Sequence, residues 1–121
     1  MDSIDIANIR CYGYTGLFPE EKKLGQWFSV DLTISFDLES VGHSDELSRT
    51  LDYRLAIAAV KKLIKEKSFD LMESLAEAIA EKILAFERAQ QVRVRLTKVA
   101  APIADFDGSI TIDITRYNPV V

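Results

Sequence analysis

Residues 28–38, FSVDLTISFDL, alternate apolar and polar side chains along their whole length. A period of two is typical of a β-strand with one face toward a core and the other toward water. The inward face is carried by every second residue, namely Phe28, Val30, Leu32, Ile34, Phe36 and Leu38. This long strand therefore has one face that is almost purely apolar.

An earlier strand is predicted at residues 4–14, with one interruption in its alternation. Its first two isoleucines share one face, whereas Ile9 and Cys11 share the other. Such a change of phase predicts a bulge or bend near Asn8. The glycine- and proline-containing stretch that follows, TGLFPEEKKLGQ, is predicted to be a connecting loop.

Two helices are predicted in the middle of the chain. Residues 53–67 and 71–87 both carry apolar side chains at spacings of three and four, the pattern of an amphipathic helix. Asp52 is a plausible N-cap of the first helix. At the start of the second helix, Asp70 and Glu73 have the spacing of a capping box.

The order of these elements predicts the fold class. Residues 91–99 and 109–117 alternate like strands, and the polar segment 42–50 reads as a crossing loop or a short turn of helix. The order strand, strand, helix, helix, strand, strand is typical of an α+β fold, with two helices on one face of a mainly antiparallel four-stranded sheet. Such a sheet leaves two open edges, so we expect a symmetric homo-oligomer.

Length and composition limit the classes of function. A chain of 121 residues with 48% hydrophobic residues has the size and core material of a single domain, residues 1–121. No apolar run is long enough for a membrane span, and the dispersed basic residues at a net charge of −4 disfavour nucleic acid. One cysteine and one histidine are too few for a typical zinc site and suit a reducing compartment, so we expect a soluble, cytoplasmic protein without a metal.

Lys98 is the residue that the strand pattern does not explain. Val92, Val94 and Leu96 lie on one face of their strand. Lys98 continues the same spacing of two residues, so it would point to that face if the strand continues. The lysine could end the strand and reach out to water at the sheet margin. It could instead lie in a partly dry cleft, where desolvation would suit it to proton donation or Schiff-base chemistry. The pattern alone leaves both interpretations open.

Three other positions have both a structural and a chemical interpretation. Glu73 could complete the capping box or present two acceptor oxygens to a planar ligand with adjacent N–H groups. Tyr53 could pack at its helix start or act as an acid or base. Glu20 and Glu21, in the predicted loop, would by default be solvated surface charges.

Four stretches together resemble a known family. YGYTGLFPEEKKLGQWFSVDL, TLDY, DLMESLAEAIA and VRVRLTKVAAPI resemble, in this order and with similar spacing, the dihydroneopterin aldolases of folate biosynthesis. The resemblance implies the tunnelling fold, or T-fold, whose members assemble into tetrameric rings and octamers. It also implies retro-aldol cleavage of a pterin substrate, 7,8-dihydroneopterin, to 6-hydroxymethyl-7,8-dihydropterin and glycolaldehyde. No cofactor is implied, because the reduced pterin ring itself accepts the electrons.

The resemblance implies four site residues besides those of the neighbouring subunit. Glu73 would anchor the pterin by accepting hydrogen bonds from the ring N–H and the 2-amino group. Lys98 would help to protonate N5 through water, and Glu21 would be the loop carboxylate beside this lysine, a role for which Glu20 is less suited. Met72 would line the pocket.

The neighbouring subunit would complete the site. The resemblance implies that its Tyr53 takes part in proton transfer near the side-chain hydroxyl groups and that its Leu51 lines the pocket. Thr15 and Val99 depart from the family, in which many members have histidine and proline at these positions. These departures bear on loop contacts and on substrate preference.

Several alternative functions stay open. The aldolase is expected to have 2′-epimerase activity as well, because recombination on the other face of glycolaldehyde gives the epimer. A dihydroneopterin triphosphate epimerase would need extra cations near the side-chain exit, for which Arg10, Lys22 and Lys23 are candidates. A non-catalytic pterin- or purine-binding T-fold protein would need only the anchor. A zinc-dependent T-fold synthase is disfavoured by the single histidine.

Overall fold

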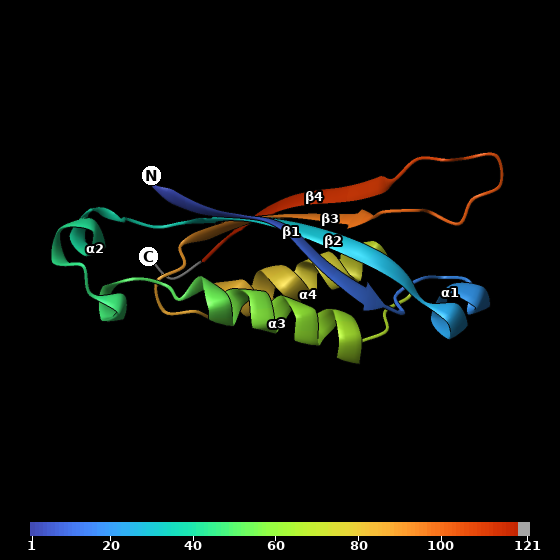
Figure 1. The fold of residues 1–121 in the computed structure, drawn as a ribbon, viewed down its shortest axis with the longest axis horizontal. Helices are drawn as coiled ribbons and strands as arrows, with labels where there is room; N and C mark the ends of the chain where they lie inside the picture. The colour runs from blue at the N-terminus through green and yellow to red at the C-terminus, as the bar shows by residue number, and fades with distance from the viewer. Residues whose placement is uncertain (119–121) are drawn as a thin grey trace.

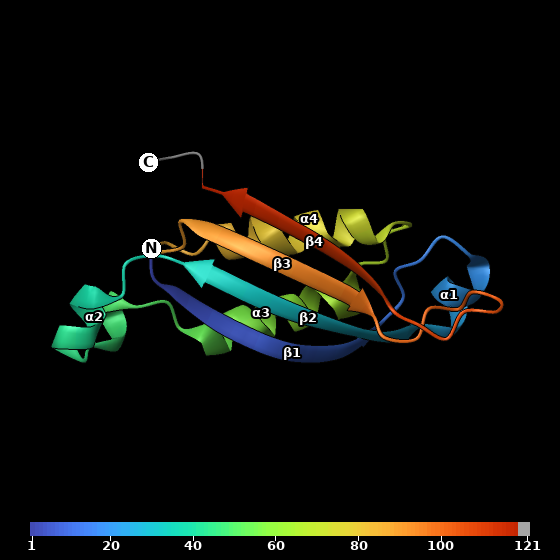
Figure 2. The same ribbon diagram turned by 90° about the horizontal axis from the view of Figure 1, so that it is seen from above.

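The computed structural model describes residues 1–118, which form a four-stranded antiparallel sheet with two longer helices on one face (Figure 1). The elements in chain order are β1 (Ser3–Gly13), α1 (Pro19–Leu24), β2 (Gln26–Ser35), α2 (Glu39–Ser44), the 3₁₀ turn η1 (Leu47–Arg49), α3 (Tyr53–Glu66), α4 (Met72–Leu84), β3 (Gln91–Lys98) and β4 (Ile110–Tyr117). The strands lie in the order β1-β2-β3-β4 (Figure 2). The predicted α+β fold and its order of strands and longer helices are confirmed.

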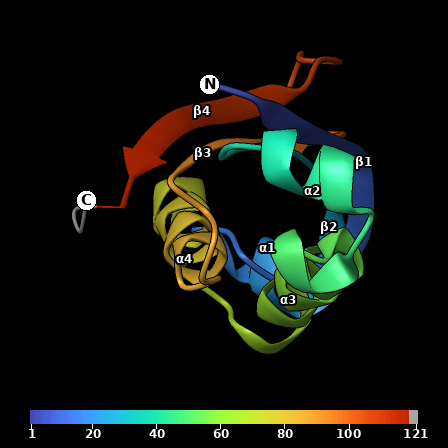
Figure 3. The same cartoon turned by 90° about the vertical axis from the view of Figure 1, so that its left-hand side faces the viewer.

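The core lies between the sheet and the helices. α3 packs on β1, and α4 packs on β3 and β4. Seen along its length, the sheet curves over both helices (Figure 3). The fully buried large side chains come from both layers and are Phe28, Val30, Leu32, Ile34, Val60, Ile64, Leu75, Ile79, Ile83, Val92, Val94 and Leu96. The alternation of β2 and β3 therefore places the predicted faces in the core.

The predicted bulge in β1 is confirmed. The pairing of β1 with β2 shifts register between Ile6 and Ile9. Asn8 has a positive φ of 58°, a conformation that asparagine tolerates better than most residues. Its backbone N–H donates to Asp31 Oδ1 at 2.7 Å, which gives a partner to a group that the irregular pairing would otherwise leave unbonded.

The two predicted helix caps have different outcomes. Asp52 is the N-cap of α3 and accepts a hydrogen bond from the backbone N–H of Arg54 at 3.0 Å, as predicted. The capping box at α4 is wrong, because the N-cap is Leu71 and no side chain caps this end. Asp70 instead forms an ion pair with Lys22 at 2.8 Å. The Asp70 carboxylate is therefore engaged with a side chain of α1 and does not cap α4.

The connections contain more helix than the sequence pattern indicated. The predicted loop between the first two strands includes α1, and the polar segment after β2 contains α2 and η1. β2 ends at Ser35, earlier than predicted, and the next residue, Phe36, donates its N–H to the carbonyl oxygen of Asp2 at 3.1 Å. Every helix among residues 1–118 is too short or too polar to span a bilayer.

Candidate active site

Lys98 and Glu21 form a buried ion pair. Lys98 is the last residue of β3, opposite Phe28 of β2, and its ammonium Nζ donates to Glu21 Oε2 at 2.6 Å. Their side chains are only 14% and 4% exposed. Lys98 thus keeps the inward direction of its strand face and meets a carboxylate there. This geometry excludes its interpretation as a solvated residue at the sheet margin.

The short helix α1 places Glu21 in this buried position. Pro19 opens the helix, where its missing N–H leaves no hydrogen bond unmade. Glu21 follows in the first turn, and its Oε1 accepts from the backbone N–H of Phe18 at 3.3 Å. Gly16 lies so close that a Cβ there would be 2.5 Å from the Glu21 Cβ atom. A residue with no side chain at position 16 is therefore required for this packing.

The pKa of the Glu21 carboxyl group is lowered. Burial by itself raises the pKa, but hydrogen bonds from Lys98, Gln26 and the Phe18 backbone, together with the charge of Lys98, outweigh it. The Gln26 contribution comes from Nε2, which donates to Glu21 Oε2 at 2.8 Å. The carboxylate is therefore ionised at neutral pH.

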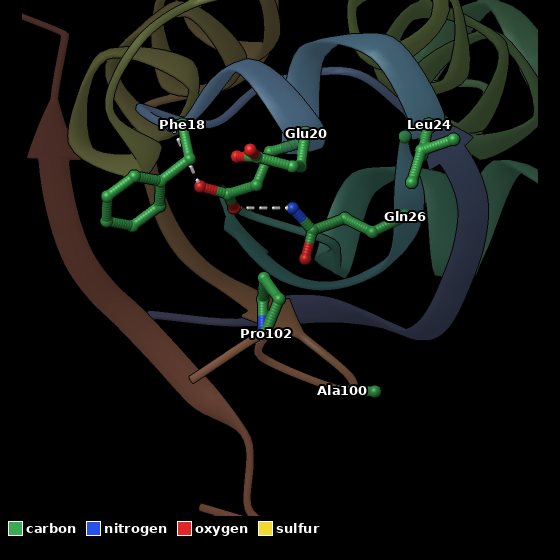
Figure 4. A pocket seen from close by; sticks show the side chains of 8 residues that line it. Phe18, Glu20, Leu24, Gln26, Ala100 and Pro102 are labelled. Atoms are coloured by element: carbon green, nitrogen blue, oxygen red, sulfur yellow. Dashed lines mark hydrogen bonds between the residues drawn. The ribbon is translucent and has the colours of Figure 1, made fainter. Parts of the chain in front are cut away.

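A pocket of about 490 Å³ opens beside this pair (Figure 4). This volume is in the range of small-molecule sites. Its walls are apolar and acidic, and they are formed by Phe18, Glu20, Glu21, Leu24, Gly25, Gln26, Ala100 and Pro102. The pocket can thus hold an apolar, hydrogen-bonding ligand next to a buried ion pair.

The start of α4 is tethered to the segment that carries Glu21. Besides the ion pair with Asp70, Lys22 Nζ donates to the Phe69 carbonyl oxygen at 3.3 Å. The Phe69 N–H donates to Thr15 Oγ1 at 3.2 Å, which gives this fully buried hydroxyl group a partner. α1, the start of α4 and the end of β3 accordingly lie at the same end of the molecule (Figure 1).

Glu73 is the second residue of α4 and keeps its carboxylate free. Its side chain has no hydrogen bond or ion pair with any other residue from 1 to 118. The capping interpretation of Glu73 is therefore wrong for this chain. An unpaired carboxylate in the first turn of a helix can accept two hydrogen bonds from a ligand.

Tyr53 and Leu51 lie away from Lys98 within the chain. Tyr53 opens α3, at the end of the helix layer opposite the end of β3 (Figure 1), and its side chain is 54% exposed. Leu51 and Met72 are buried in the hydrophobic core, and neither lines the pocket of about 490 Å³. The structure therefore brings Lys98 and Glu21 together but leaves Tyr53 apart from them.

Gln26 is a site residue that the sequence analysis missed, although the sequence held a signal for it. Gln26 lies two residues before Phe28, on the inward face of β2, just as Lys98 lies on the inward face of β3. Both are polar residues in the apolar alternation of a strand. Thr15 had no such signal, because its partner Phe69 is distant in the sequence.

No three His, Cys, Asp or Glu side chains lie close enough to hold a metal ion within residues 1–118.

Comparison with known proteins gives one consistent result. The family model described as dihydroneopterin aldolase matches residues 4–115. A Synechocystis protein named probable dihydroneopterin aldolase is 55% identical over 116 residues, covering 96% of this chain and 98% of that protein. The dihydroneopterin aldolase of Bacillus subtilis is 39% identical over 117 residues, with coverage of 96% and 98%.

A solved structure agrees along nearly the whole chain. The Escherichia coli dihydroneopterin aldolase in complex with neopterin superposes with a TM-score of 0.88 at 26% identity, covering 96% of this chain and 99% of that one. The expected T-fold is thereby confirmed.

Proposed function

This chain belongs to the dihydroneopterin aldolase family, and we propose that it cleaves 7,8-dihydroneopterin into 6-hydroxymethyl-7,8-dihydropterin and glycolaldehyde. The enzyme is accordingly a carbon–carbon lyase. The observation that carries the proposal is the buried pair of Lys98 and Glu21 beside a pocket of about 490 Å³. A charged pair has a high desolvation cost, so its presence at a pocket favours a chemical role.

Glu73 anchors the pterin ring in this proposal. Its carboxylate has no partner among residues 1–118 and stands in the first turn of α4. The two oxygens match the ring N–H and the 2-amino group, which lie side by side on the pterin. The tether between α4 and the α1 segment would hold this anchor at a fixed distance from the Glu21 carboxylate.

The substrate supplies the electron sink for bond cleavage. The bond between C1′ and C2′ breaks as the 2′-hydroxyl loses its proton, and C2′ and C3′ leave as glycolaldehyde. The electron pair moves to C1′ and through C6=N5, so N5 takes up a proton. Reprotonation at C1′, with loss of the N5 proton, gives the product. A return of C1′ to the other face of glycolaldehyde gives the 2′-epimer, which is the proposed second activity.

Lys98 acts as a proton-relay cation in this scheme. Its Nζ is bonded to the ionised Glu21, and a protonated amine has no lone pair for attack on a carbonyl group. The ammonium ion can instead donate toward N5 through water as charge develops there. Glu21 holds the ammonium group in place and balances its charge.

A second subunit completes the site in this proposal. Tyr53 begins α3 at one end of the molecule, and Lys98 ends β3 at the opposite end. Both residues can therefore act in proton transfer at one site only if two chains share that site. Within residues 1–118, the edge strands β1 and β4 each pair on one side only, so each can pair with a strand of a neighbouring copy in a ring. We infer that the chains assemble into a tetrameric ring or an octamer. We also infer that the protein is located in the cytoplasm, because the buried Cys11, which forms no disulfide, suits reducing conditions.

The structure gives less support to a dihydroneopterin triphosphate epimerase. A triphosphate needs cations, yet no lysine or arginine lines the pocket of about 490 Å³. Two of the candidate cations are engaged elsewhere, since Lys22 pairs with Asp70 and Arg10 stacks over the Trp27 ring at 5.4 Å. A non-catalytic binder is also less favoured, because binding would need the Glu73 anchor but not the Lys98 and Glu21 pair.

The decisive assay follows the product. Purified protein is incubated with 7,8-dihydroneopterin in EDTA, and 6-hydroxymethyl-7,8-dihydropterin is quantified, with the triphosphate substrate in parallel. We expect cleavage of the free substrate without added metal, and failure to form product would refute the aldolase. Sodium borohydride added during turnover should trap no adduct on Lys98. A covalent adduct there would contradict the relay role.

A further inference from the structure

Gln26 has an amide group whose two ends have different surroundings. Its Nε2 donates to Glu21 Oε2 at 2.8 Å and to the Thr15 carbonyl oxygen at 3.4 Å. Its Oε1 is shielded from solvent and has no hydrogen-bond partner, and it is the sole buried side-chain N or O atom in this state among residues 1–118. Turning the amide over would set its oxygen against two other oxygens. The orientation is therefore determined by Glu21 and Thr15.

A buried acceptor without a donor is unfavourable and calls for an explanation. Gln26 lines the pocket of about 490 Å³. In Figure 4 its amide nitrogen points toward the carboxylate and its oxygen points to the side of Pro102, across the pocket. The acceptor without a partner thus belongs to a residue of the pocket wall and points to the side of Pro102.

We propose that Gln26 is a further substrate-binding residue, whose Oε1 accepts a hydrogen bond from a hydroxyl group of the substrate side chain. This inference rests on the proposed function. Gln26 Nε2 and Lys98 Nζ donate to the same Glu21 oxygen, so the amide lies near the ammonium group that serves N5.

The chemistry of the substrate indicates which of its groups donates a hydrogen bond to Gln26 Oε1. The hydroxylated side chain is attached at C6, the atom next to N5. N5 of the bound imine carries no hydrogen atom, and the ring N–H groups that Glu73 takes lie at the far side of the pterin. The side-chain hydroxyl groups are therefore the donors within reach of Gln26. Contact with a hydroxyl group would give Oε1 the partner that it lacks among residues 1–118.

Two ligands distinguish a direct contact between Gln26 and the substrate from a role in which Gln26 only positions Glu21. Neopterin carries the hydroxylated side chain and 6-methylpterin lacks it, and both are oxidised pterins that provide stable binding probes. In Gln26→Met, which keeps the length of the side chain, we expect the Kd of neopterin to rise about tenfold. The Kd of 6-methylpterin should change by less than about twofold. Gln90→Met, at an exposed position, is the matched control and should alter neither Kd.

The outcomes distinguish this inference from the proposed function. An equal loss for both ligands, or no loss for either, would overturn the Gln26 contact, while cleavage of 7,8-dihydroneopterin by the wild type would leave the aldolase standing. Absence of that cleavage would overturn the aldolase instead. Should Gln26→Met fail to fold, a crystal structure of the wild type with neopterin tests the contact directly. We expect a ligand hydroxyl within about 3.2 Å of Oε1, and a nearest hydroxyl beyond about 3.5 Å would refute it.

Discussion

Replacing Lys98 by methionine should lower the free energy of unfolding by about 3 kcal/mol. The change removes the ammonium group from a carboxylate whose side chain is 4% exposed, so the Glu21 charge stays buried without its counter-ion. Loss of one partner of a buried pair costs about 3 to 5 kcal/mol in general. The lower end applies because Glu21 keeps the hydrogen bonds from Gln26 Nε2 and the Phe18 N–H.

A second ion pair on the same strand provides the matched control. Arg93 Nη2 lies 2.6 Å from Asp113 Oδ2, the same separation as in the Lys98 pair, but these side chains are 50% and 39% exposed. Water screens this exposed pair, so Arg93→Met should destabilise the protein much less. The double variant Glu21→Gln, Lys98→Met removes both buried charges and should recover to within about 1 kcal/mol of the wild type.

Urea unfolding followed by the fluorescence of Trp27, the single tryptophan, measures these differences. All variants must be compared at one protomer concentration, because assembly of subunits raises the apparent stability by mass action. If Lys98→Met loses no more stability than Arg93→Met, the reasoning from burial is refuted. A double variant as unstable as Lys98→Met alone would contradict the assigned cause, the uncompensated charge of Glu21.

Three further predictions concern pH, catalysis and assembly. Because the folded state lowers the pKa of Glu21, the stability from this group is present above the unfolded value of about 4.3 and is lost as the pH falls through the lower folded value. Urea titrations across that range should show a weaker pH dependence in Glu21→Gln, and an unchanged slope would contradict the linkage. Lys98→Ala should reduce kcat by about 10²- to 10⁴-fold with little change in the Kd of neopterin, whereas Glu73→Ala should weaken this Kd by about 100-fold. Steady-state kinetics measure kcat and binding titrations measure Kd. The reverse pattern would mean that the roles assigned to Lys98 and Glu73 are exchanged. Mixed rings of Tyr53→Phe and Lys98→Ala subunits should regain activity at about a quarter of their sites, and no regain after verified subunit exchange would show that the two residues act within one chain.

Much of the fold could be predicted because its signals are local. The alternation in β2 and the helical spacing in α3 and α4 reflect which side of each element meets the core, and the shift of phase near Asn8 marked the bulge. α1 escaped prediction, and α2 was anticipated only in part, by the short turn of helix that was one alternative for residues 42–50. Each is a six-residue helix without an apolar stripe long enough to detect. The capping box at α4 failed for another reason, since Asp70 forms an ion pair with Lys22 of α1, a residue distant in the sequence.

The candidate site was predictable only in part. Lys98 stood out as a polar residue on an apolar strand face, and the resemblance to the aldolases singled out Glu21, Tyr53 and Glu73. Gln26 showed the same local signal as Lys98 and was overlooked. No pattern in the sequence indicated that Thr15 would bond to the Phe69 backbone, because that contact joins two loops of independent sequence.

The sequence by itself determined which faces of the strands and helices are apolar, because side-chain direction follows from the backbone period of each element. It also identified Lys98 as a lysine on the apolar side of its strand pattern, without deciding between the core and the sheet margin. Only the tertiary structure decided what this lysine meets, because Glu21 reaches it through the folding of α1 against the end of β3. Among residues 1–118, the carboxylate of Glu73 has no partner and the buried Oε1 of Gln26 has no donor. Such pairings depend on the distance between segments remote in sequence, which no local period encodes.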